Sequence, residues 1–160
     1  MIISWPKWFQ ASIQKHLIAV AATLPITAYV EGEDRQTDDK LEYVEIRTNG
    51  PDILQVSKNV YRIDVLINVL ITVKRSIKNT WRRHELSGIF MNAMTPEIDI
   101  YRLGNSVEDD KSKFTCLPLR NDLSESMGVQ FRDLGRLQTA ADLTQTMLQG
   151  TYRISNLQGD

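Results

Sequence analysis

Residues 60–74, VYRIDVLINVLITVK, alternate between apolar and more polar side chains. The odd-numbered positions are all apolar: Tyr61, Ile63, Val65, Ile67, Val69, Ile71 and Val73. A period of two is typical of a β-strand. A membrane-spanning helix would need about 20 mostly apolar residues without interior charges, whereas Arg62 and Asp64 lie inside this run. The run therefore predicts one long strand and no membrane segment.

This strand is long for the chain that contains it. At roughly 3.3 Å per residue it would measure about 50 Å, while a compact chain of this size has a radius of gyration of ~15 Å. Leu66 and Leu70 make its second face apolar at two points, so both faces are expected to be covered in the middle. We expect the strand to be bent or to outrun its own core, with the excess length serving a subunit contact.

The bulk composition is that of an ordinary globular domain. The 160 residues are 42% hydrophobic and 24% charged, which predicts a single domain with a core that needs no disulfide or metal. The formal net charge of −1 predicts no general affinity for nucleic acid. Residues 1–3 lack the charged start of a signal peptide, so we expect synthesis and retention in a cytoplasm.

The remaining segments predict two helices and several further strands. Apolar residues at helical spacing predict a helix over residues 5–24, with Ser4 as its N-cap, and a second helix from residue 79 or 80 to the Thr95-Pro96 pair. Strands are expected over residues 26–30, 41–48, 97–103, 114–120, 129–134 and 144–154. The Asn-Gly-Pro-Asp sequence at 49–52 predicts a turn. The predicted fold is α+β, with a mostly antiparallel sheet, a long central strand, and the two helices packed against it.

Residue types that carry catalysis are scarce. The two histidines, His16 and His84, are far apart in sequence, and the single cysteine, Cys116, is expected to be a buried thiol. None of the common metal, phosphate-loop or nucleophile motifs is present. We predict no catalytic residues, no metal and no cofactor.

A metal-dependent nuclease is an alternative, because carboxylates on adjacent strands can hold Mg²⁺ and orient water. Glu45 and Arg47 on one strand, Asp52 in the predicted turn and Asp64 on the next strand would supply such a site. Their order and the missing lysine do not match the usual restriction-type pattern.

Two charged segments are candidates for protein contacts. The basic cluster consists of Lys74, Arg75, Lys78, Arg82 and Arg83, with Trp81 among them, and could also contact phosphates or simply be solvated. The acidic segment, residues 31–42, includes Asp34, Asp38 and Asp39. Opposite charges on one chain favour self-association. Charge reversal of Arg82 and Arg83 should weaken assembly if they pair across subunits.

The order of elements resembles that of the tail terminator proteins of long-tailed bacteriophages. The resemblance covers the N-terminal helix, the strand pair joined through NGPDILQVSKN, the long strand, the helix RRHELSGIFMNAM, and the strands EIDIYRLG and TQTMLQGTYRI. Other neck proteins, such as head-closure and tail-completion proteins, resemble the chain in the same way.

The resemblance implies a structural virion protein of the tail or neck, assembled in the host cytoplasm. It would form a hexameric ring that caps the tail tube and contacts the head connector, with DNA passing through. The interface candidates are the acidic residues Asp34, Asp38 and Asp39, the basic cluster with Trp81, and, in a second polar loop, Asp109 and Asp110. The acidic segment could instead face the lumen of the ring.

Overall fold

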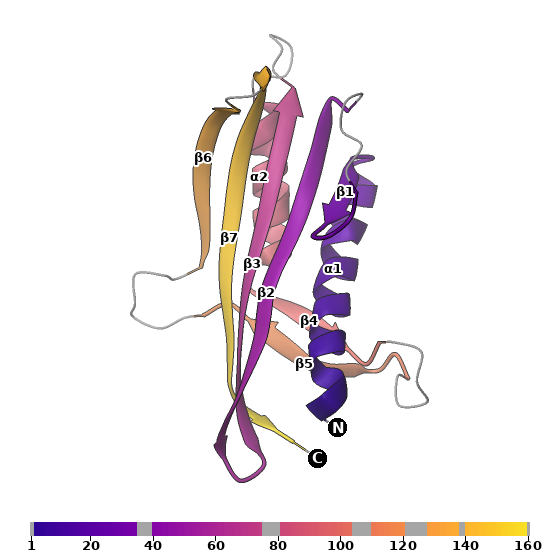
Figure 1. The fold of residues 1–160 in the computed structure, drawn as a ribbon, viewed down its shortest axis with the longest axis vertical. Helices are drawn as coiled ribbons and strands as arrows, with labels where there is room; N and C mark the ends of the chain where they lie inside the picture. The colour runs from indigo at the N-terminus through magenta and orange to yellow at the C-terminus, as the bar shows by residue number, and fades with distance from the viewer. Residues whose placement is uncertain are drawn as a thin grey trace.

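The computed structural model describes residues 2–34, 40–74, 81–103, 110–120, 128–137 and 140–159. Within them the elements are, in chain order, η1 (Ile2–Ser4), α1 (Trp5–Thr23), β1 (Thr27–Val30), β2 (Glu42–Ser57), β3 (Val60–Lys74), α2 (Arg82–Met94), β4 (Glu97–Tyr101), β5 (Lys113–Pro118), β6 (Val129–Leu137) and β7 (Ala140–Gln158). Figure 1 shows a tall sheet with both α-helices and the β4–β5 pair on one side of it. The fold is α+β.

The main sheet has the strand order β1-β2-β3-β7-β6. β1 is parallel to β2, and every other neighbouring pair is antiparallel. β3 is 15 residues long and third in this order. The β4–β5 pair forms a separate two-stranded antiparallel sheet.

The core lies between the helices and one face of the main sheet. The odd-numbered side chains of β3 from Ile63 to Val73 are buried there. α1 contributes apolar residues at spacings of three and four, which place them on one helical face: Trp5, Trp8, Phe9, Ile13 and Leu17. α2 contributes Leu86, Phe90 and Met94 in the same way. Tyr152 of β7 is also buried, and its hydroxyl donates a hydrogen bond to the Met94 carbonyl oxygen, 2.8 Å away.

The predicted turn at residues 49–52 is wrong. β2 continues through these residues, and its register with β3 shifts between Asn49 and Asp52 as it does at a β-bulge. Gly50 has a φ of +100°, which suits glycine, and its carbonyl oxygen accepts a hydrogen bond from Gln10 Nε2 of α1 at 2.7 Å. The chain instead reverses at Lys58 and Asn59. β2 is therefore as long as β3.

Two smaller expectations also change. Ser4 is the N-cap of α1, but its side chain makes no capping hydrogen bond. Cys116 is half-buried, because its strand β5 belongs to the small sheet, and its Sγ donates to Asp99 Oδ1 at 3.4 Å. The predicted start of the second helix at residue 79 or 80 lies outside the described residues.

Candidate assembly interface

Arg82, at the start of α2, is held within its own chain. Its Nε lies 2.9 Å from Glu42 Oε2, its Nη2 lies 3.0 Å from Glu42 Oε1, and its Nη1 lies 3.1 Å from Glu85 Oε2. The Glu42 carboxylate, with a smaller contribution from Glu85, raises the pKa of Arg82 above its usual range. The guanidinium thus fastens α2 to the start of β2.

The other described members of the basic cluster also lie beside acidic residues of the same chain. Arg83 binds both carboxylate oxygens of Asp133 on β6, at 2.9 and 3.0 Å. Lys74, at the end of β3, lies 3.5 Å from Asp142 Oδ2. Arg75 and Lys78 lie outside the described residues. An interface role for these cations stays a prediction.

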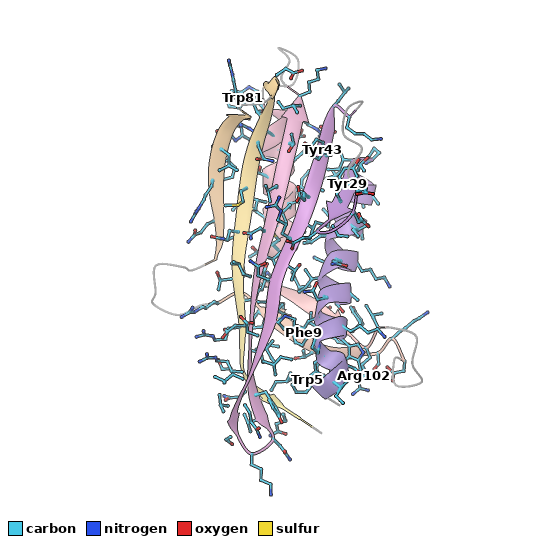
Figure 2. The ribbon with its side chains drawn as sticks, in the orientation of Figure 1. Trp5, Phe9, Tyr29, Tyr43, Trp81 and Arg102 are labelled. Atoms are coloured by element: carbon cyan, nitrogen blue, oxygen red, sulfur yellow. The ribbon has the colours of Figure 1, made fainter. Side chains whose placement is uncertain are left out.

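Trp81 is the most exposed aromatic residue of the described chain, at 76%. The centroid of the His84 ring lies 6.1 Å from that of Trp81 and 5.7 Å from that of Phe131 on β6, on which His84 is stacked. The three aromatic side chains therefore form a row. Figure 2 places Trp81 at the upper end of the molecule, near β6. Phe131 and Leu134 of β6 are also exposed. Exposed aromatic residues grouped in this way are typical of protein interfaces.

The two acidic candidates that the structure describes, Asp34 and Asp110, lie in different segments of the chain. Asp34 is exposed in the segment after β1, together with Glu31 and Glu33. Asp110 lies in the loop between β4 and β5, where the Ser112 hydroxyl and amide lower the pKa of its carboxyl. Asp38, Asp39 and Asp109 lie outside the described residues.

The carboxylates of the nuclease alternative are spread along the sheet. Asp52 and Asp64 are register partners on β2 and β3, but Glu45 is opposite Leu70. Six residues of strand separate Leu70 from Asp64, which is about 20 Å. Asp64 is also held by Arg153 Nε at 2.5 Å and Arg62 Nε at 3.0 Å. Glu45 is therefore too far from Asp52 and Asp64 to share one metal ion with them.

A different group of metal-ligand types, which the sequence did not indicate, lies on the small sheet. Glu97, Asp99 and Cys116 bring their ligand atoms within 4.8 Å of one another. Lys113 Nζ already lies 2.7 Å from Asp99 Oδ1 and lowers the pKa of that carboxyl. Although the Lys113 ammonium favours the thiolate, burial and the neighbouring Asp99 and Glu97 raise the pKa of the Cys116 thiol. A neutral thiol beside a lysine is a poor metal ligand.

The tip of the β2–β3 hairpin was also missed from the sequence. Leu54 and Val56 are 51% and 48% exposed there. In Figure 1 this tip extends beyond the end of α1 and beyond β4 and β5. The alternation of apolar and polar residues in Ile-Leu-Gln-Val-Ser at 53–57 could have predicted that the strand continues here. The turn predicted from Asn-Gly-Pro-Asp led to the opposite expectation.

The second face of the main sheet mixes polar and apolar side chains. One cross-strand row contains Arg47, Asn68 and Gln149, and Gln149 Nε2 donates to Asn68 Oδ1 at 3.1 Å. The next row contains Glu45, Leu70 and Met147. Figure 1 shows no helix on this side among the elements it draws with labels.

Comparison with known proteins indicates a fold and no function. No family model and no curated protein matches the sequence. One solved structure, whose description names no function, superimposes with a TM-score of 0.52 at 13% identity and covers 96% of each chain. A likeness at this identity shows the fold alone. In the described part of the chain, no helix combines the length and apolarity needed to span a bilayer.

Proposed function

We propose that this protein is a structural subunit of a hexameric ring that caps the tail tube of a long-tailed bacteriophage and joins it to the head connector. Its partners would be further copies of itself, the tube protein and the connector, with DNA as passing cargo. In this proposal the protein performs no catalysis, and its location is the tail or neck of the virion.

The observation that carries the proposal is the overrun of β2 and β3. A strand of 15 residues is about 50 Å long, and the hairpin tip lies beyond the helices that cover the rest of it. Leu54 and Val56 leave about half of their apolar surface exposed on this tip. Exposed apolar side chains on a projecting hairpin are typical of a surface that binds a second protein.

Ion pairs and cation–π contacts within the chain also support a structural role, because they hold the helices and sheets in fixed positions. Arg82 with Glu42 and Arg83 with Asp133 tie α2 to both sides of the sheet. Arg102 lies over the rings of Trp8 and Phe114, 5.9 Å from each centroid, which ties α1 to the small sheet. A subunit braced in this manner can present its edges and its hairpin in fixed positions to neighbours.

Electron microscopy of the purified protein tests the proposal. We expect closed rings with a central channel, and we expect them to disappear in a variant whose hairpin tip is made polar. Particles without a channel, in a preparation that cleaves DNA when metal is added, would contradict it and favour the nuclease alternative.

A further inference from the structure

The two edge strands of the main sheet lie at the same level on opposite sides of the molecule. Through the strand registers, Val30 of β1 shares a cross-strand row with Phe131 of β6, and Tyr29 shares the next row with Arg132. Glu42, at the end of the acidic segment, shares a row with Arg136. Figure 1 shows β1 and β6 at opposite sides of the upper half of the sheet.

The β6 edge carries a positive surplus. Arg132 and Arg136 are exposed, and Arg132 makes a hydrogen bond to the neutral side chain of Gln130. The one acidic residue of this strand, Asp133, is neutralised by Arg83. The exposed Phe131 and Leu134 supply apolar surface beside these charges.

The β1 edge carries the opposite charge. Glu31, Glu33 and Asp34 directly follow β1 and are exposed. Glu33 Oε2 accepts a hydrogen bond from the Val30 amide at 3.1 Å, which holds the start of the acidic segment against the end of β1. Leu41, at the other end of the segment, is 67% exposed and supplies apolar surface.

We propose that the acidic edge at β1 of one copy binds the basic edge at β6 of the next copy. A head-to-tail contact needs two different, complementary surfaces on one chain, and it closes into a ring when the rotation between copies allows. Along the sheet the strand directions place β6 antiparallel to β1. Two copies in the same orientation would therefore bring these edges together in the antiparallel arrangement that strands adopt most often.

This inference rests on the proposed function for the identity of the partner, which is a second copy of the chain. It goes beyond that function by assigning the surfaces, and it places the contact at the level of Phe131 and Val30 instead of at the Arg82 and Arg83 cluster.

A charge exchange tests the assignment. The first variant, Arg132→Glu with Arg136→Glu, makes the β6 edge acidic. The second, Glu31→Lys with Asp34→Lys, makes the β1 edge basic. Each variant alone should weaken self-association by at least about tenfold, as measured by sedimentation. Lys15→Glu, an exposed position on α1, is the control and should leave self-association unchanged.

An equimolar mixture of the two variants should recover self-association, because every contact then joins opposite charges. Circular dichroism checks that each variant is folded, and Arg132→Gln with Arg136→Gln replaces the first variant if the reversal unfolds it. A reversal without effect, or a mixture that fails to recover, overturns the edge assignment but leaves rings, and hence the proposed function, intact. A wild-type chain that stays monomeric up to about 1 mM also overturns the assignment.

Discussion

Arg83 on α2 and Asp133 on β6 form a two-pronged ion pair, with Nη1 2.9 Å from Oδ1 and Nη2 3.0 Å from Oδ2. Asp133 Oδ1 also accepts a hydrogen bond from the Gly135 amide at 2.8 Å. The pair connects the second helix to the edge strand of the sheet. From the sequence, the Arg83 guanidinium is a candidate for a contact between subunits, whereas here it binds a carboxylate of its own chain.

Replacing Arg83 with Ala should lower the free energy of unfolding by about 1 kcal/mol. The value is at the upper end for surface pairs, because the geometry is bidentate while Asp133 remains partly exposed. Urea denaturation of Arg83→Ala, Asp133→Ala and the double variant measures the coupling between the two residues. Additive effects of the two single changes would show that the pair contributes nothing.

This pair also affects how charge reversal of Arg83 is interpreted. An Arg83→Glu variant that fails to assemble has lost an internal contact as well as a surface charge. Adding Asp133→Arg to it restores an internal pair of opposite sense. If both stability and assembly recover, Arg83 acts only within its own subunit. If stability recovers but assembly does not, the positive charge of Arg83 also contributes to the contact between subunits.

Replacing Gly50 with Ala should destabilise the protein by about 1–3 kcal/mol. Gly50 has a φ of +100°, and an added Cβ would lie 2.8 Å from the Asp64 carbonyl oxygen and 3.0 Å from the Asp52 amide nitrogen. Gly88→Ala in α2 is the matched control, because no atom lies within 4 Å of its added Cβ and a helical alanine is favoured by up to about 1 kcal/mol. Thermal unfolding of both variants should show shifts in opposite directions, and equal shifts would contradict the bulge geometry.

Gly50 lies in a strand and not in a turn, and this part of the fold depends on contacts distant in sequence. The alternation in residues 60–74 and the helical spacing from Trp5 to Leu17 identified elements correctly, because each pattern is repeated over many residues. The Asn-Gly-Pro-Asp sequence has the composition of both a turn and a bulge. Which one forms depends on the long partner strand and on Gln10 of a distant helix, and neither is visible locally.

The candidate surfaces were less predictable than the fold. Arg82 and Asp34 could be recognised as charged, but their partners or exposure depend on tertiary contacts. The shared level of Val30 and Phe131 follows from four strand registers at once, and no pattern within one segment encodes it.

Tyr152 should make the protein sensitive to alkaline pH. Burial raises the pKa of its hydroxyl above the usual range. A raised folded-state pKa means that this contribution to stability is complete below pH ~10 and is lost as the pH rises above it, by up to about 1.4 kcal/mol per pH unit. Tyr152→Phe should flatten the fall above pH ~10 while losing about 1 kcal/mol at neutral pH with the hydrogen bond to Met94. If the free energy of unfolding of this variant falls as steeply above pH ~10 as that of the wild type, other groups cause the loss of stability.

Making the hairpin tip polar should abolish assembly without unfolding the subunit. Leu54→Thr with Val56→Thr retains side chains that suit a strand and changes two exposed positions, so the unfolding free energy should shift by less than about 1 kcal/mol. The control is Gln55→Thr, an exposed position between them. Size-exclusion chromatography should show smaller species for the double variant and no change for the control, and rings that persist in the double variant would exclude the tip as an interface.

Whether the protein is a ring-forming structural subunit can be measured from its mass in solution over a wide range of concentration, together with an assay for DNA cleavage. We expect a closed hexamer that dissociates as salt screens its charged edges, with no cleavage of DNA at any metal concentration. A monomer at every concentration that cleaves DNA in the presence of a divalent metal would contradict it.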